Sequence, residues 1–205
     1  MTRRYEHLFN WPNLLTLARI SVVPLLVVFY YLPYWWAHLA AAIIFMIASI
    51  TDWLDGYLAR YLRQSTKLGA FLDPVADKLM VSIALILIVA EPTFQFISIP
   101  SAVLTIPALV ITLPAAVIVA REIIVSALRE WMAEIGQRTS VAVTNLGKIK
   151  TAVQMIALVV LLYCDSSTPA ILVFTGYIFL YIAAVLTIWS MLIYLKAAWV
   201  QLIAH

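Results

Sequence analysis

Six apolar runs divide the chain, and they constrain its fold more than any other feature of the sequence. They cover roughly residues 14–33, 36–51, 71–90, 97–120, 149–164 and 170–195. A helix that crosses the hydrocarbon core of a bilayer needs about 20 predominantly apolar residues. The sequence therefore predicts an all-α integral membrane protein with six transmembrane helices. Three runs are shorter or carry charges near one end, so we expect their helices to project beyond the hydrocarbon there.

The composition excludes the main soluble classes of protein. Hydrophobic residues make up 65% of the chain, charged residues make up 11%, and the mean hydropathy is +1.02. An average soluble domain is about 45–50% apolar and about 25% charged, so this chain cannot cover its surface with polar groups. The single cysteine, Cys164, excludes intrachain disulfides and multi-cysteine metal sites. We expect it to be a small buried side chain near the end of a span.

The distribution of charge predicts the orientation of the helices. The loops at 32–36, 91–100 and 165–169 contain no lysine or arginine, so all 13 basic residues fall on the opposite side. Because cytoplasmic loops carry the excess of Lys and Arg, we expect both termini in the cytoplasm. The same reasoning takes the basic residues as topology signals, and we expect no nucleic acid partner.

Prolines predict two further features of the helices. Pro12 is typical of a helix start, and we expect a short N-terminal amphipathic segment before the first span. Pro100, Pro107 and Pro114 recur within the fourth run, so we expect a bent helix there. The sequence shows no internal repeat, and we expect residues 1–205 to form a single membrane domain.

Four aspartates lie on the cytoplasmic side, where the second and third runs are joined. Asp52 and Asp55 are three residues apart at the end of one run, and Asp73 and Asp77 are four residues apart at the start of the next. On an α-helix the members of each pair share one face. Neighbouring antiparallel helices bring both pairs to the same membrane depth, so the four carboxylates can converge.

Converging carboxylates require cations. An ionised aspartate within a bilayer costs about 2.5–3.5 kcal/mol on insertion scales, before mutual repulsion is counted. Two divalent cations would balance four carboxylates, and ligands that are all oxygen favour Mg²⁺ or Mn²⁺. Two adjacent metals are a recurring device for phosphoryl displacement. Helix capping is the alternative: Asp73 before Pro74 has the pattern of an N-cap, but the other three aspartates stay unexplained.

Small residues flank the aspartates. Gly56 and Ala59 follow the first pair, and Gly69 precedes the second pair by four residues. Small side chains let a bulky ligand approach the backbone, and Arg60 adds a fixed cation that suits a diphosphate. Close packing between helices is the alternative interpretation of the small residues.

The spacing D-x2-D-G-x2-A-R-x8-G-x3-D-x3-D resembles the signature of the CDP-alcohol phosphotransferase family. Its eight fixed positions are Asp52, Asp55, Gly56, Ala59, Arg60, Gly69, Asp73 and Asp77. The resemblance implies a six-span membrane enzyme, usually a homodimer, with two divalent metals among the four aspartates. It also implies a CDP-linked donor beside the metals, against Gly56, Ala59, Arg60 and Gly69, and it makes Asp77 the general base.

The resemblance extends over nearly the whole chain, through residues 12–19, 120–131 and 147–151. These segments are most similar to bacterial members of the family that use CDP-diacylglycerol and sn-glycerol 3-phosphate. They imply transfer of the phosphatidyl group to the 1-hydroxyl of sn-glycerol 3-phosphate, with release of CMP. They also imply a bacterial inner membrane protein whose active site faces the cytoplasm.

Basic residues near the fourth and fifth runs suit the phosphate of this acceptor. Arg121 and Arg129 are eight residues apart, which is about 80° around a helix, and Lys148 and Lys150 begin the next span on the same side. A cationic pocket would hold a phosphate by charge-assisted hydrogen bonds. The alternative is that these residues set the topology and pair with nearby glutamates such as Glu122.

Several functions remain open from the residues alone. The same chemistry could use another acceptor, and the cationic side argues against choline and serine but not against inositol phosphate or phosphatidylglycerol. A cation transporter could use the aspartates as ion ligands, although the outer half of each span is uncharged. A purely structural membrane anchor leaves the aspartates unexplained.

Overall fold

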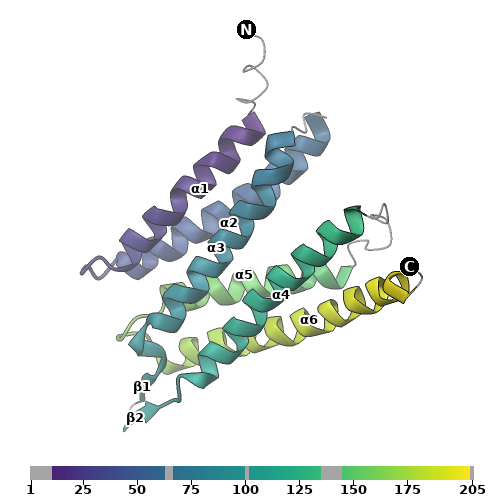
Figure 1. Cartoon of the computed structure of the whole chain (residues 1–205). Coiled ribbons are helices and arrows are strands. Elements are labelled where there is room, and N and C mark those ends of the chain that lie inside the picture. Colours follow the sequence, from purple (N-terminus) through teal and green to yellow (C-terminus); the bar gives the residue numbers. More distant parts are fainter. Residues whose placement is uncertain (1–10, 63–66, 100–101, 135–144, 204–205) are drawn as a thin grey trace. The chain divides into compact units, whose positions relative to one another are not determined.

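The structure is a computed structural model that describes residues 11–62, 67–99, 102–134 and 145–203 (Figure 1). Each of the six apolar runs contributes to a helix. The helices are α1 (Trp11–Tyr30), α2 (Ala37–Leu62), α3 (Lys67–Ala90), α4 (Leu109–Glu134), α5 (Asn145–Tyr163) and α6 (Ala170–Ile203). Pro12 lies in the first turn of α1, as its position in the sequence predicts. The expected N-terminal amphipathic segment lies outside the described residues.

A short hairpin replaces the start of the expected fourth helix. After the 3₁₀ turn η2 (Pro92–Phe94), β1 (Phe96–Ile99) pairs antiparallel with β2 (Ala102–Thr105), with Phe96 opposite Thr105. The prediction of helix from residue 97, and of an all-α chain, is therefore wrong here. Apolar β-branched residues suit a strand as well as a helix, and proline lacks the backbone N–H that continues a helix. Among the three prolines of that run, only Pro114 lies inside α4.

The helices that carry the aspartates are longer than their apolar runs. α2 continues to Leu62, and α3 already begins at Lys67, so Asp73 and Pro74 both lie inside α3. The alternative interpretation of Asp73 as an N-cap is therefore wrong. The two turns that precede Asp73 carry it into the helix interior, where its side chain is available for other contacts.

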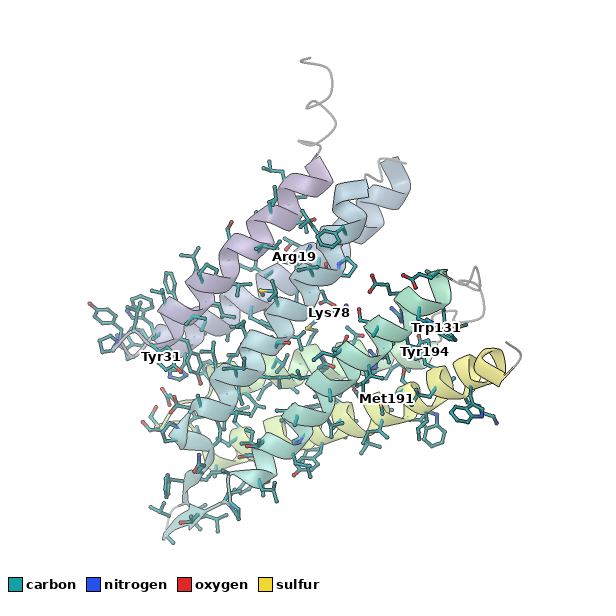
Figure 2. All side chains as sticks on the ribbon, in the orientation of Figure 1. Arg19, Tyr31, Lys78, Trp131, Met191 and Tyr194 are labelled. Carbon is teal, nitrogen blue, oxygen red and sulfur yellow. The ribbon has the colours of Figure 1, made fainter. Side chains whose placement is uncertain are left out.

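The chain folds as two compact units. The first contains Met1–Ala90 with Leu162–Asp165, and the second contains Glu91–Leu161 with Ser166–His205. In the first unit α1 packs against both α2 and α3, and in the second α4 packs against α6. Figure 2 shows the side chains of both units, with Arg19 labelled in the first and Tyr194 in the second.

Two helices are long and apolar enough to cross a membrane within the part of the chain that the structure describes. They are Leu109–Glu134 and Ala170–Lys196, and shorter apolar stretches occupy Leu14–Tyr30, Ala37–Asp52 and Ile149–Tyr163. Large apolar side chains lie on the outside of α6, among them Ile178, Val185 and Trp189. A water-exposed surface seldom carries so many, whereas lipid accommodates them.

Candidate active site

Helix α1 contacts both of the helices that carry the aspartates. Thr16 and Arg19 are three residues apart on α1 and are 1% and 4% exposed. The Thr16 hydroxyl donates a hydrogen bond of 2.6 Å to Asp73 Oδ1 on α3. Arg19 Nη1 forms an ion pair with Asp52 Oδ1 on α2. One face of α1 therefore holds a carboxylate from each neighbouring helix.

Charges of both signs meet at this site. Asp52 and Asp73 lie close enough for their carboxylates to repel each other, and the Arg19 guanidinium attracts Asp52. The Asp52 side chain is 40% exposed although its arginine partner is buried, and Asp73 is also exposed. Asp77 lies one turn further along α3 and is half-buried. The site thus has solvent-accessible carboxylates next to the buried guanidinium of Arg19.

This donor chemistry fits a divalent cation. The groups that α1 gathers are carboxylate and hydroxyl oxygens, which hard cations such as Mg²⁺ prefer. A further positive charge between Asp52 and Asp73 would relieve the repulsion between their carboxylates. Within the described residues, no three acidic, histidine or cysteine side chains are grouped closely enough to hold a metal.

Several of the predicted site residues lie outside the described side chains. Asp55, Gly56, Ala59 and Arg60 belong to the last turns of α2, but the structure describes no side chain there. Gly69 is buried in the first turn of α3. The structure therefore brings Asp52 and Asp73 together and leaves the donor-binding residues as predictions.

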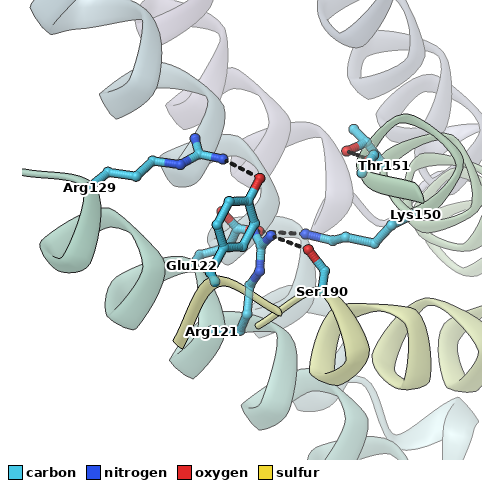
Figure 3. Close-up of polar contacts among 8 residues, drawn as sticks. Arg121, Glu122, Arg129, Lys150, Thr151 and Ser190 are labelled. Carbon is cyan, nitrogen blue, oxygen red and sulfur yellow. Dashed lines mark hydrogen bonds and ion pairs between the residues drawn. The ribbon is translucent and has the colours of Figure 1, made fainter. Parts of the chain in front are cut away.

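A second polar cluster lies in the second unit, around Glu122 (Figure 3). Glu122 Oε1 accepts hydrogen bonds from Arg121 Nη1 at 2.9 Å and from Lys150 Nζ at 2.7 Å. Arg121 Nη2 donates to Ser190 Oγ on α6 at 3.1 Å. Lys150 is 4% exposed, so the pair that joins α4 to α5 is buried on its lysine side.

Arg129 reaches the same region from two turns further along α4. Its Nη2 donates a 3.1 Å hydrogen bond to the Tyr194 hydroxyl, and its Cζ lies 5.2 Å from the centre of that ring. Arg121 Cζ lies 5.9 Å from the same centre. Both guanidinium groups therefore lie within about 6 Å of the centre of one aromatic ring.

One hydrogen-bond donor of Arg121, the Nε–H group, is available to a ligand. Its Nε is buried and has no hydrogen-bond partner among the described residues, although both terminal nitrogens are bonded. A buried N–H without a partner is costly and rare, so it is typical of a place where a ligand or water belongs. The pairing with Glu122 that the sequence left as an alternative is also real, for Arg121 and for Lys150. The Lys148 side chain lies outside the described part of the structure.

Sequence reasoning assigned no role to four residues of these clusters. Arg19 had a signal, because a charge inside an apolar run marks a functional site by default, and Thr16 precedes it by three residues. Ser190 and Tyr194 had none, since small polar and aromatic residues in a long apolar run are unremarkable. Only the packing of α6 against α4 brings them to the arginines.

A family model and several known proteins match most of this chain. A family model described as CDP-alcohol phosphatidyltransferase matches residues 9–189. A Salmonella choleraesuis protein is 52% identical over 191 residues, covering 93% of this chain and 95% of the relative. Relatives from Pectobacterium atrosepticum and Escherichia coli K12 are 54% and 50% identical, with the same coverage. All three are named CDP-diacylglycerol--glycerol-3-phosphate 3-phosphatidyltransferase.

Proposed function

This chain belongs to the CDP-alcohol phosphatidyltransferase family, and we propose that it transfers the phosphatidyl group of CDP-diacylglycerol to the 1-hydroxyl of sn-glycerol 3-phosphate. The products are phosphatidylglycerophosphate and CMP, which makes the chain a membrane transferase of phospholipid biosynthesis. The observation that carries this proposal is the identity of about half the residues to relatives that share one name and are matched over 95% of their length.

The first unit supplies the reacting centre in this proposal. Asp52, Asp55, Asp73 and Asp77 would hold two divalent cations, Mg²⁺ or Mn²⁺, whose charge would stabilise the diphosphate of the donor. The gathering of Asp52 and Asp73 by α1 supports this assignment. Thr16 and Arg19 fix those two carboxylates, so α1 orients the ligand set before the substrate binds.

The donor lies against the small residues of the signature. Gly56, Ala59 and Gly69 leave space for the CDP headgroup, and Arg60 faces its diphosphate as a fixed cation. The attacking oxygen forms a bond to the β-phosphorus, and the bond from that phosphorus to the CMP oxygen breaks. Asp77 accepts the proton from the attacking hydroxyl, which typically contributes about 10²–10⁴-fold to the rate.

The second unit supplies the acceptor site. Arg121, Arg129, Lys148 and Lys150 surround the phosphate of sn-glycerol 3-phosphate. The unpartnered Nε of Arg121 supports this role, because a phosphate oxygen would complete the hydrogen bonding of that guanidinium. Lys150 acts mainly through Glu122, since its ammonium already has a carboxylate partner at 2.7 Å.

We also propose the arrangement of the chain in the membrane. Six helices span a bacterial inner membrane as a single domain over residues 1–205, with both termini and the active site on the cytoplasmic side. The absence of Lys and Arg from the loops at 32–36, 91–100 and 165–169 supports this orientation. We expect the enzyme to be a homodimer, as is usual in the family that it resembles.

An acceptor panel tests the function. Purified enzyme in detergent micelles with CDP-diacylglycerol and Mg²⁺ or Mn²⁺ should release CMP with sn-glycerol 3-phosphate, and not with inositol phosphate, serine, choline or phosphatidylglycerol. EDTA should abolish release, and so should Asp52→Asn or Asp73→Asn. CMP release with a different acceptor alone would overturn the substrate assignment, and divalent cation uptake into liposomes without CMP release would favour a transporter.

A further inference from the structure

Helix α6 brings a buried phenol close to both arginines of the proposed acceptor site. Tyr194 is 6% exposed, and Ser190 lies one turn before it on α6. Tyr194 accepts the hydrogen bond from Arg129, and Ser190 accepts the one from Arg121. The centre of the Tyr194 ring lies 5.2 Å from Arg129 Cζ and 5.9 Å from Arg121 Cζ, and Figure 3 shows both arginines together with Ser190. Helix α6 therefore contacts both cations through two neutral side chains.

The partners of the arginines differ in charge: one neutralises a guanidinium, and the other only fixes its position. Glu122 is anionic, so its contacts with Arg121 and Lys150 reduce the positive charge that a ligand would meet. Tyr194 is neutral, so its contact with Arg129 fixes the guanidinium and leaves its charge intact. The electron-rich face of an aromatic ring also attracts cations within about 6 Å of its centre, and both Cζ atoms lie within that distance.

Of the two arginine side chains, that of Arg129 gains most from being held in one conformation before a ligand binds. Its side chain is exposed, and a free arginine side chain samples many rotamers, which binding would have to freeze. A rigid ring that is already packed in the second unit holds the guanidinium in one place before the ligand arrives. Preorganisation of this kind improves affinity by lowering the entropy that binding costs.

We propose that Tyr194 is a positioning residue that holds Arg121 and Arg129 in the common orientation that binds the phosphate of the acceptor. The inference rests on the proposed function, because it takes these arginines as the acceptor site. It assigns specificity to α6: the ring and hydroxyl of Tyr194 act on the affinity for the acceptor and leave the donor untouched.

Two variants of Tyr194 test the proposal by steady-state kinetics. Tyr194→Leu removes ring and hydroxyl, and it should raise the KM for sn-glycerol 3-phosphate about tenfold, the usual worth of a hydrogen bond to a charged group. Tyr194→Phe keeps the ring and should raise this KM less. For both variants the KM for CDP-diacylglycerol and kcat should stay within about twofold. Inorganic phosphate, used as a competitive inhibitor, should lose affinity in parallel with the acceptor.

Tyr181→Phe is the matched control. Tyr181 also lies on α6, and its hydroxyl donates to the Val110 carbonyl at 2.8 Å. Thirteen residues of helix place it about 20 Å from Tyr194. Loss of this hydroxyl should change neither KM.

The outcomes separate this inference from the proposed function. If the wild type transfers to sn-glycerol 3-phosphate and Arg129→Ala raises the KM for it while Tyr194→Leu does not, the positioning role is refuted alone. Equal rises in both KM values for Tyr194→Phe would also refute it, because they would indicate structural damage. Absence of transfer by the wild type would instead refute the proposed function.

Discussion

Among single residues, Arg19 of the first unit is a buried cation that pairs with a more exposed carboxylate. Arg19 contributes a charge at 4% exposure, and its carboxylate partner Asp52 is far more exposed. A buried charge is tolerated when it is paired, and breaking such a pair is more harmful than never having it. Arg19 therefore compensates Asp52 in the protein without metal, and it does so without covering the carboxylate from solvent.

Arg19→Gln tests this compensation through stability. Because Asp52 stays partly solvated, we expect a loss of about 1–2 kcal/mol in metal-free protein, less than for a fully buried pair. Mn²⁺ should then raise the melting temperature of the variant more than that of the wild type, since the unpaired carboxylate gains more from a cation. Thermal unfolding in detergent with and without Mn²⁺ measures both effects.

Arg129→Gln is the control for charge removal, because Arg129 is exposed and contacts Tyr194 in the other unit. Its response to Mn²⁺ should match the wild type. If Mn²⁺ raised the melting temperature of Arg19→Gln no more than that of the wild type, the compensating role of Arg19 would be contradicted.

Asp77→Asn tests the general base. We expect turnover to fall about 10²–10⁴-fold, because the amide cannot accept the proton of the attacking hydroxyl, while the three remaining aspartates retain Mn²⁺ and donor binding. Mn²⁺ titration, donor titration and CMP release should be measured on the same preparation. Loss of Mn²⁺ binding would make Asp77 chiefly a ligand, and unimpaired turnover would exclude both roles.

At the scale of elements, α6 organises the second unit along its length. Tyr177 donates a 2.7 Å hydrogen bond to the Phe94 carbonyl, and Tyr181 binds the Val110 carbonyl at the start of α4. These phenols satisfy backbone groups beside the hairpin at one end of α6. Ser190 and Tyr194 serve the arginines further along the same helix.

Gly176 on α6 lies against Leu161 on α5. A Cβ at this position would lie 2.5 Å from Leu161 Cδ2 and 2.8 Å from Leu161 Cγ, so a side chain does not fit without movement. We expect Gly176→Leu to lose about 1–3 kcal/mol by overpacking. A lower melting temperature in detergent would show this.

Val185→Leu adds bulk at an exposed position of α6 and should leave the melting temperature unchanged. Gly176→Ala should have the smaller effect of the two glycine variants, because alanine favours a helix by about 1 kcal/mol over glycine and partly offsets the contact. An unchanged melting temperature in Gly176→Leu would show that α5 and α6 are not in close contact there.

At the scale of the whole molecule, the distribution of basic residues predicts which loops face outward. The single cysteine provides a clean background for a test. Cys164 is 0% exposed in the loop after α5, and burial, with a smaller contribution from Asp165, raises the pKa of its thiol to about 12. Because the thiolate is the reactive form, this thiol should resist maleimide at pH 7 until the protein unfolds.

Cysteines introduced at exposed sites then report the orientation. With Cys164→Ala as background, Tyr34→Cys and Ser166→Cys should react with a membrane-impermeant maleimide in spheroplasts. Glu134→Cys, at the end of α4, should react only after the membrane is permeabilised. The reverse pattern would invert the proposed topology, and labelling of Glu134→Cys together with the other two would refute it.

Features that depend on short stretches of chain could be predicted from the amino-acid sequence alone. Hydropathy adds up locally, so the six helical runs follow from residues that are neighbours in sequence. The spacing of Asp52 and Asp55, and of Asp73 and Asp77, fixes shared helix faces by periodicity alone. The apolar run from residue 97 was the exception, because its residues suit both strand and helix, and the hairpin forms where β1 contacts α6.

The contacts between side chains of different helices could not be predicted in this way, because they depend on how the helices pack. The rotation of α1 against α2 and α3 brings Arg19 into contact with Asp52 and Thr16 into contact with Asp73. The packing of α6 on α4 brings the Tyr194 phenol close to both arginines. These contacts depend on helix order and rotation, which the summed packing of many side chains settles. An apolar run that is uniform around its circumference carries too little asymmetry to encode that rotation in its own sequence.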